Sequence, residues 1–527
     1  MKMYFSYNIS EKKKFKIYII ILTGFSICLN QFFANRGIFP IDSFLIFDSA
    51  YNIISGNHPF KDYWSITGPF LDYIQSLFFI TFGISWTSYV LHGSALNMAL
   101  TLFSFYFFLN IGLKNYYAFI YSLGVAILAY SSIGAPFIDH HSTIFSIMAC
   151  FSVSLAILSK KNLFWIITPI FITFSFFSKQ IPSPYFTVLF AIIISIYFYT
   201  TKSVNKNILL NLFFGILISF FLVASVFLIN EIPINNFLIQ YIFYPFSLGE
   251  ERINRLNIDF KNLISQFKFI YIALIPLIIS TFFLIKIKKK DLVQKNELIV
   301  SLLFLGSVAI LVYCQLLTKN QILIFFLIPI SAAYSHAYTL KYFNNKYLIY
   351  FILAIFIFST AKYHIRFNHH KKFIELVNAD FNLAEDATQL DKRLKWVKWI
   401  TPHYIDKPLD EINLLIETKN ILFEVRERKI FITDYQFFSS LLNNKFASPN
   451  KWYDNQSIPD KKNKYYYVYK EFFLNKVKNN KIKHLFFIGK HKRELHFFEE
   501  FINENECVAS NQHNELLIEF DISKCKF

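Results

Sequence analysis

Eleven apolar stretches, each close to the length of a membrane-spanning helix, occupy most of the first 363 residues and constrain the fold more than any other feature. A helix needs about 20 apolar residues to cross the hydrocarbon core of a bilayer. The stretches are residues 17–34, 87–110, 115–132, 142–158, 163–178, 184–200, 208–229, 269–286, 298–317, 322–340 and 347–363. With 66 phenylalanines in 527 residues and only 17% charged residues, the composition argues against a cytosolic enzyme, a disordered chain or a nucleic-acid binder.

A twelfth apolar stretch, residues 68–85, contains Pro69, Asp72 and Gln75, so its length alone does not show whether it crosses the membrane. Cytoplasmic loops of membrane proteins contain more Lys and Arg than the loops on the other side. If the lysine-rich N-terminus is cytoplasmic and this stretch does not cross, the inner segments hold about twice as many basic residues as the outer loops. A crossing at 68–85 would place the lysine clusters outside. We therefore predict eleven spans, a first outer loop at 35–86, and an interfacial or re-entrant helix at 68–85.

After residue 363 the chain is rich in Lys, Asn and Glu, and none of its apolar runs is long enough to cross a membrane. Helices and strands alternate in this tail, which predicts a small sheet with crossover helices. The predicted helices are 409–426, 465–480 and 490–503, and the predicted strands are 429–433, 483–488 and 515–520. Eleven spans place this tail outside the cytoplasm, where Cys507 and Cys525 can pair.

The predicted fold class is therefore a polytopic α-helical membrane protein (residues 1–363) with a C-terminal extracytoplasmic α/β domain (residues 364–527). The pattern fits a bacterial inner membrane with the C-terminal domain in the periplasm.

The first outer loop concentrates carboxylates at the membrane edge, where ionisable groups indicate a functional site. Asp42 directly follows the first span, and Asp48, Asp62 and Asp72 come within the next thirty residues. Pro40 can open a helix that Gly56 can end, and the helix dipole keeps an Asp near that N-terminus ionised. Such a carboxylate suits a general base for an incoming hydroxyl. It can equally be a helix cap.

This loop resembles the first loop of GT-C membrane glycosyltransferases, the superfamily of protein O-mannosyltransferases and the lipid A aminoarabinose transferase. Their pattern is an acidic residue after the first span, a helix, Gly-x-x-Pro-[Phe/Tyr]-x-Asp, Gly-Pro, and an apolar stretch that ends in Phe-Gly. The corresponding residues here are Asp42, the segment Gly56 to Asp62, Gly68-Pro69 and Phe82-Gly83.

The resemblance implies a GT-C fold with juxtamembrane helices in this loop and an acidic catalytic base. Many members have Asp-Glu where this chain has Asp42-Ser43. Asp48 therefore remains an alternative base, although the spacing to Gly56 favours Asp42. Asp62, the acidic residue of the motif, is predicted to contact the substrate or donor.

The second outer loop contains Asp139, His140 and His141 in sequence. These residue types can bind a divalent metal, but three adjacent residues cannot all face one ion from a regular helix. They can also hold a donor phosphate or a sugar, which is our prediction, or simply cap the following span. We predict no metal site and no certain cofactor, with a divalent metal as the open possibility.

Positive and amide side chains occur at three further outer positions. These are Lys179-Gln180, Arg252 with Arg255, and Lys319-Asn320-Gln321. Lys and Arg suit a phosphate held at the membrane surface, and interfacial snorkelling explains them equally well. We predict that they contact the donor.

The sequence has no Walker A motif, no Gly-x-Ser-x-Gly elbow and no Cys-x-x-Cys pair, which argues against ATP-driven transport, a serine hydrolase of that type and a zinc site. We expect an inverting glycosyltransferase that moves a sugar from a polyprenyl-phosphate or polyprenyl-diphosphate carrier to a glycan, lipid or protein acceptor at the outer face, in contact with membrane lipids and without nucleic acid. The alternatives are a lipid-linked oligosaccharide flippase or transporter, and a polysaccharide polymerase or ligase.

Overall fold

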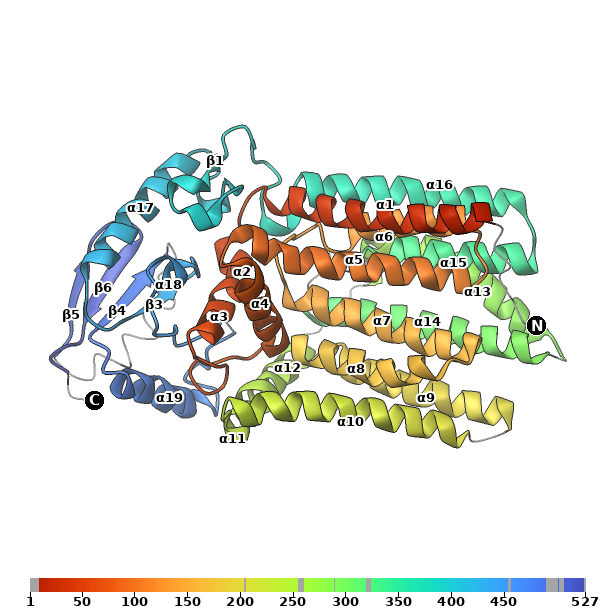
Figure 1. Ribbon diagram of the computed structural model, residues 1–527, viewed down its shortest axis with the longest axis horizontal. Coiled ribbons are helices and arrows are strands. Elements are labelled where there is room, and N and C mark those ends of the chain that lie inside the picture. Colours follow the sequence, from red (N-terminus) through yellow and green to blue (C-terminus); the bar gives the residue numbers. More distant parts are fainter. Residues whose placement is uncertain are drawn as a thin grey trace.

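The computed structural model describes residues 9–202, 205–254, 260–288, 290–318, 324–453, 456–489, 501 and 507–525. It consists of a long helix bundle, a group of short helices at one end of the bundle, and a C-terminal domain beyond them (Figure 1). Helix α1 begins at the far end, so the start of the chain and the C-terminal domain lie at opposite ends of the bundle (Figure 1).

Each of the eleven predicted spans corresponds to a helix in the bundle. Within the described ranges, eight helical segments are long and apolar enough to cross a membrane. They contain α1 (Ile9–Ala34), α5 (Trp86–Asn110), α7 (Ile138–Ser159), α9 (Ser183–Thr201), α10 (Lys206–Ile229), α13 (Phe260–Lys286), α14 (Leu292–Thr318) and α16 (Lys346–Tyr363). The other three predicted spans form the shorter helices α6 (Asn115–Leu128), α8 (Asn162–Ser178) and α15 (Leu327–Tyr342). The chain is thus a polytopic helical protein, and eight of the eleven spans reach full crossing length.

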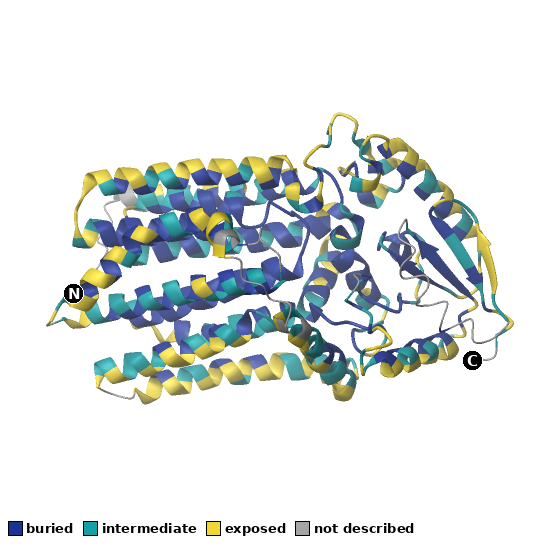
Figure 2. Cartoon of the chain, turned by 180° about the vertical axis from the view of Figure 1, so that it is seen from behind, coloured by how far each residue is buried: buried dark blue, intermediate teal, exposed yellow. Residues whose placement is uncertain are grey.

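The outer faces of the bundle are apolar, which is the pattern of a membrane protein. Figure 2 shows exposed residues along the outside of the bundle and buried residues at its centre and at its junction with the C-terminal domain. On α10, Phe220 is 64% exposed and Leu228 is 78% exposed. Water-soluble monomers rarely expose apolar patches that run along a whole helix.

The first outer loop forms three short helices between the bundle and the C-terminal domain (Figure 1). They are α2 (Pro40–Ser43), α3 (Leu45–Ile54) and α4 (Pro69–Phe82). Pro40 opens α2, and Gly56 follows α3 with a φ of 86°, as predicted for a left-handed position at a helix C-terminus. The predicted helix at 68–85 is α4, only 14 residues long.

A second group of short helices follows α10 at the same end of the bundle. It comprises α11 (Ile234–Phe237), the π-helix η1 (Leu238–Phe243) and α12 (Tyr244–Asn254). After α16 the chain continues through the π-helix η2 (His364–His369) and the 3₁₀-helix η3 (Lys372–Ile374) into the C-terminal domain.

The C-terminal domain holds a four-stranded sheet of order β3-β4-β6-β5. Strands β3 (Lys429–Thr433) and β4 (His484–Ile488) are parallel, joined by a connection that includes α19 (Tyr466–Asn479). Strand β6 (Leu517–Asp521) is antiparallel to β4 and to the edge strand β5 (Ala509–Gln512).

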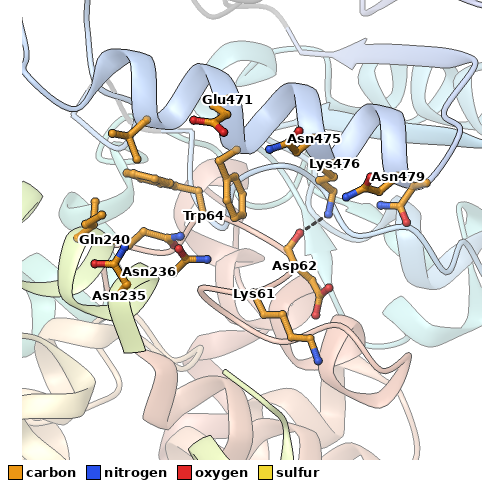
Figure 3. Close-up of a pocket in the computed structure, with 14 residues that line it drawn as sticks. Lys61, Asp62, Trp64, Asn235, Asn236, Gln240, Glu471, Asn475, Lys476 and Asn479 are labelled. Atoms are coloured by element: carbon orange, nitrogen blue, oxygen red, sulfur yellow. Dashed lines mark hydrogen bonds between the residues drawn. The ribbon is translucent and has the colours of Figure 1, made fainter. Parts of the chain in front are cut away.

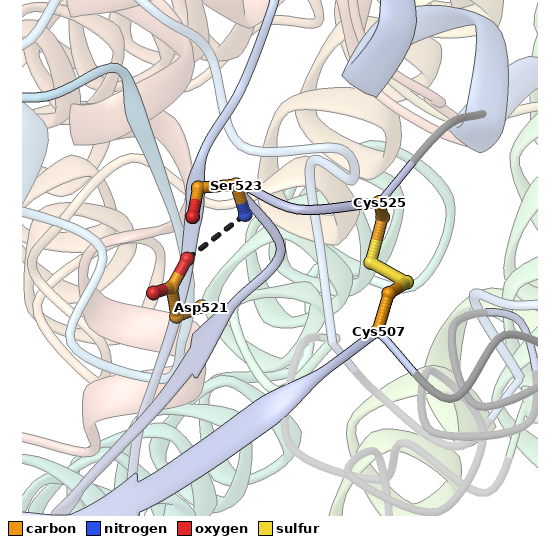
Figure 4. The surroundings of a disulfide bond; sticks show 4 residues. All are labelled: Cys507, Asp521, Ser523 and Cys525. Carbon is orange, nitrogen blue, oxygen red and sulfur yellow. Dashed lines mark hydrogen bonds between the residues drawn. A yellow bond between two sulfur atoms is a disulfide. The ribbon is translucent and has the colours of Figure 1, made fainter.

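The remaining elements of the domain are α17 (Pro408–Glu424), α18 (Phe438–Leu441), the two-residue strands β1 (Glu385–Asp386) and β2 (Lys398–Trp399), and the 3₁₀ turns η4 (Ala387–Gln389), η5 (Lys392–Leu394) and η6 (Pro402–Tyr404). Cys507 and Cys525 form a disulfide that closes the β5–β6 hairpin (Figure 4). The predicted helix at 490–503 falls, apart from residue 501, outside the described residues.

Candidate functional site

A cavity of about 260 Å³, here called the Asp42 cavity, lies where the bundle meets the C-terminal domain. Its wall combines the first outer loop, the ends of three bundle helices, α12 and the C-terminal domain. The lining residues are Asp42, Ile66, Thr67, Phe137, Asp139, Lys179, Gln180, Pro245, Leu248, Arg252, Thr318, Phe373, Trp452 and Gln456. Five residues that the sequence predicted for one site therefore share this cavity: Asp42, Asp139, Lys179, Gln180 and Arg252.

Asp42 is half-buried and is the third residue of α2. The N-cap of α2 is Phe39, whose backbone N–H donates to Ser43 Oγ at 3.0 Å, so Asp42 does not occupy the cap position. Helix α2 is only four residues long, and Asp42 is the acidic residue of its single turn.

Asp48, the alternative base, is placed differently. It is 4% exposed on α3, accepts a hydrogen bond from Asn52 Nδ2 at 3.0 Å, and is not among the described residues that line the Asp42 cavity. Burial raises the pKa of Asp48 to about 6, although hydrogen bonds from Ser439 and Asn52 and the charge of Lys476 oppose that shift. The geometry separates the two carboxylates: one faces a cavity, and the other is enclosed beneath the C-terminal domain.

An ion pair between the ends of two bundle helices lines the same cavity. Lys179 directly follows α8, Asp139 lies in the first turn of α7, and Lys179 Nζ is 2.5 Å from Asp139 Oδ1. The neighbouring Gln180 donates through Nε2 to the carbonyls of Ile66 (2.7 Å) and Tyr241 (2.8 Å). Gln180 thus ties the first outer loop to η1 and fixes the wall of the cavity.

Arg252 brings a guanidinium group from α12 to the side of the cavity formed by the C-terminal domain. Its Nε donates to Gln456 Oε1 at 3.1 Å, and the hydroxyl of Tyr244 donates to the backbone carbonyl of Gln456 at 2.8 Å. Because Gln456 Oε1 is a neutral acceptor, this contact does not neutralise the guanidinium charge.

Two further polar atoms in the wall are buried and have no hydrogen-bond partner in the described part of the chain. They are the hydroxyl of Thr67 and the indole N–H of Trp452. A buried donor without a partner is costly, so both groups are suited to a ligand oxygen.

A buried ion pair joins the first outer loop to the C-terminal domain next to this cavity. Lys451 Nζ lies 2.6 Å from Asp72 Oδ1, and the two side chains are 1% and 0% exposed. The same ammonium donates to the carbonyls of Thr67 (2.8 Å) and Gly68 (3.0 Å). Gly68 has a φ of 61°, and a Cβ there would come within 2.9 Å of Lys451 Nζ, so this close approach needs glycine.

The other predicted site residues lie elsewhere. His140 and His141 are each 1% exposed in the bundle, where His140 pairs with Ser132 Oγ and His141 contacts His92 and Tyr130. Asp62 lines a second cavity. Arg255, Lys319, Asn320 and Gln321 lie outside the described residues.

The described ranges contain no group of three or more His, Cys, Asp or Glu side chains arranged to hold a metal ion. Of the three adjacent residues of the second outer loop, Asp139 lines the Asp42 cavity, whereas His140 and His141 are buried inside the bundle.

Three lining residues from η3 and the C-terminal domain were not predicted from the sequence: Phe373, Trp452 and Gln456. The only sequence signal was the aromatic Lys451-Trp452-Tyr453 segment in an otherwise polar loop. The chain matches no model of a known protein family, and a comparison with curated proteins finds no similar sequence.

Proposed function

We propose that this chain is a membrane glycosyltransferase of the GT-C type that moves a sugar from a polyprenyl-phosphate or polyprenyl-diphosphate carrier to an acceptor hydroxyl at the extracytoplasmic face of a bacterial inner membrane. One observation carries the proposal: the Asp42 carboxylate shares a cavity at the end of a bundle of apolar helices with the cations Lys179 and Arg252. The motif resemblance of the first outer loop supports the same reaction class.

In the proposed reaction, Asp42 accepts the proton of the acceptor hydroxyl as its oxygen attacks the anomeric carbon. The bond from that carbon to the phosphate oxygen breaks, and the phosphate leaves with the electron pair. A single displacement from the face opposite the phosphate inverts the anomeric configuration.

The developing negative charge on the leaving phosphate is best placed next to Arg252. Arg252 is a planar, permanently charged donor suited to phosphate oxygens, whereas the charge of Lys179 is already balanced by Asp139 at 2.5 Å. Thr67 and Trp452 add two donors whose hydrogen bonds are not used within the described protein. Fixed donors directed at developing charge are a main source of catalysis.

The test is the substitution Asp42→Asn, which keeps the size of the side chain and removes the base. Loss of a general base lowers the rate by about 10²- to 10⁴-fold. The measurement is mass spectrometry of envelope lipids and glycans from cells that express wild-type or variant protein, followed by transfer assays with purified polyprenyl-phosphate sugars. We expect one sugar increment to disappear with Asp42→Asn.

The matched control is Asp48→Asn, a second carboxylate of the same loop that lies away from the cavity. It should retain the sugar increment. An Asp42→Asn strain with the wild-type glycan and lipid profile would refute the proposed reaction.

A further inference from the structure

A second cavity, of about 460 Å³, lies between the first outer loop, α11 with η1, and α19 of the C-terminal domain. Ligand pockets typically measure about 300–1,000 Å³. Figure 3 shows α19 opposite Lys61 and Asp62, with Asn235, Asn236 and Gln240 closing one side. Residues 64–67 separate the two cavities, because Trp64 lines this one while Ile66 and Thr67 line the Asp42 cavity.

Side-chain amides dominate the lining of this second cavity, here called the amide cavity. They are Asn235, Asn236, Gln240, Asn475, Asn479 and Asn480. An amide presents both a donor and an acceptor, as does a sugar hydroxyl. Such a set therefore matches a ligand that carries many hydroxyl groups.

Some of these amides shape the cavity, and others remain available. Asn236 Nδ2 and Gln240 Nε2 both donate to the carbonyl of Phe60, at 2.9 and 3.2 Å. Asn235, Asn475 and Asn479, by contrast, are exposed. Asn475 and Asn479 lie one helical turn apart on α19, so their amides project from one face of that helix.

Aromatic rings accompany the amides. Phe472 from the same helix face packs against Trp64 with ring centroids 5.8 Å apart and an interplanar angle of 69°. Trp64 is 2% exposed, and its buried indole N–H has no hydrogen-bond partner among the described residues. Because Trp64 is almost fully covered, the half-buried ring of Phe472 provides the aromatic surface of this cavity, and such a ring complements the C–H surface of a sugar.

The lining of the amide cavity contains two basic side chains, Lys61 and Lys476, and two acidic ones, Asp62 and the exposed Glu471. Lys61 Nζ lies 3.3 Å from Glu231 Oε2, and Lys476 Nζ donates to the backbone carbonyl of Asp62. The Asp62 carboxylate accepts the backbone N–H of His58 at 2.8 Å. The lining is thus balanced in charge, which favours a neutral ligand over an anion.

We propose that the amide cavity binds a neutral oligosaccharide and, if the proposed glycosyltransferase function holds, that this oligosaccharide is the acceptor. Residues 64–67 line both cavities, so a saccharide bound in the amide cavity lies against the same segment that lines the Asp42 cavity. The inference narrows the acceptor from glycan, lipid or protein to glycan.

The test measures binding of defined probes to the full-length protein in detergent by saturation-transfer NMR. The probes are maltohexaose, cellohexaose and the N-acetylglucosamine hexamer, with a Ser/Thr-rich decapeptide as the rival ligand. The test variant is Asn475→Ala/Asn479→Ala, which truncates two exposed side chains. The control is Asn420→Ala, an exposed asparagine of α17. Thermal unfolding of each variant confirms that it is folded.

We expect one or more of the oligosaccharides to bind the wild type and Asn420→Ala alike, and to bind the double variant at least about tenfold more weakly, since two hydrogen bonds are lost. Absence of oligosaccharide binding, binding unchanged in the double variant, or binding of the peptide alone would each overturn the inference.

The two proposals fail separately. Asp42→Asn should abolish transfer without changing oligosaccharide binding. Transfer with an unchanged KM for the acceptor in the double variant would reject the amide cavity and leave the glycosyltransferase intact.

Discussion

The Asp42 cavity and the amide cavity are built from the same three parts of the chain but differ in chemistry. Both use the first outer loop, the helices after α10 and the C-terminal domain. Only the Asp42 cavity also receives the ends of the bundle helices α7, α8 and α14. Those ends supply Asp139 and Lys179, whereas α19 supplies the amide cavity with Asn475 and Asn479.

The difference indicates that the two cavities have different roles. Helix ends at a membrane edge hold ionisable groups in fixed positions, as reactions that move protons and charge require. A soluble helix face that carries amides suits recognition by many modest hydrogen bonds. The following predictions test whether charge governs one cavity and neutral hydrogen bonding the other.

The largest effect is expected at the buried ion pair of Asp72 and Lys451, which joins the first outer loop to the C-terminal domain. Lys451→Met leaves Asp72 buried without its cation and should destabilise the protein by about 3–5 kcal/mol. Thermal unfolding of the purified protein measures this change. Both oligosaccharide binding and transfer should be lost together.

Two further variants of the protein serve as controls for this prediction. Lys419→Met breaks the partly exposed pair with Asp391 in the same domain and should cost no more than about 1 kcal/mol. The double variant Asp72→Asn/Lys451→Met should recover part of the lost stability. Equal destabilisation by Lys451→Met and Lys419→Met would show that the buried pair does not hold the two parts together.

We expect Asp48 to affect the pH dependence of the free energy of unfolding and to have no effect on the rate of transfer. Burial raises the pKa of Asp48 in the folded state from the ordinary value of 3.8 to about 6, so between pH 3.8 and 6 the folded state binds a proton that the unfolded state has lost. The corresponding stabilisation is present below pH 4 and is lost as the pH rises through 6, by roughly 3 kcal/mol. Asp48→Asn should remove this slope.

Denaturation midpoints of wild type and Asp48→Asn at pH 4, 5, 6 and 7 test this prediction. The difference between the two curves isolates Asp48 from the other titrating groups. Parallel curves would mean that Asp48 titrates normally. Loss of transfer in a folded Asp48→Asn protein would instead indicate that Asp48 is the general base.

Arg252 should matter for the Asp42 cavity alone. Arg252→Gln removes a charge-assisted hydrogen bond and should lower kcat/KM for transfer by about 10- to 100-fold. Oligosaccharide binding in the amide cavity should not change. Arg426→Gln, at an exposed arginine of the C-terminal domain, is the matched control. If kcat/KM fell to a similar extent in both variants, the effect of Arg252 would be that of general surface charge.

Sequence reasoning predicted the parts of this molecule that local chemistry determines. Apolar runs specified the bundle helices, and the loss of apolar length after residue 363 marked the C-terminal domain. Strands β3, β4 and β6 were predicted because their residues alternate with helical segments. Strand β5 was missed because its four residues, Ala509 to Gln512, are exposed and none of them is a large apolar residue.

The sequence predicted site residues only in the segments that connect apolar runs. Asp42, Asp139, Lys179 and Gln180 lie near the ends of apolar runs, and Arg252 lies in the segment between the runs 208–229 and 269–286. They meet because these segments lie at the same end of the bundle. Trp452 and Gln456 come from a loop at least 200 residues after Arg252, and no local pattern specifies which loop of a domain contacts a bundle. The burial of His140 and His141 likewise depends on how α5, α6 and α7 pack.

The smallest effect is expected at Lys61, and it distinguishes charge from amide recognition in the amide cavity. Its ion pair with Glu231 is exposed, with side chains 36% and 83% accessible, and exposed pairs contribute about 0–1 kcal/mol. Lys61→Ala should therefore change oligosaccharide affinity by less than about twofold, whereas Asn475→Ala/Asn479→Ala weakens it at least about tenfold. Titration of both variants with the same oligosaccharide, at low and high salt, makes the comparison. If Lys61→Ala weakened binding as much as the double variant and salt did the same in the wild type, the cavity would recognise charge, and the contrast between the two cavities would be lost.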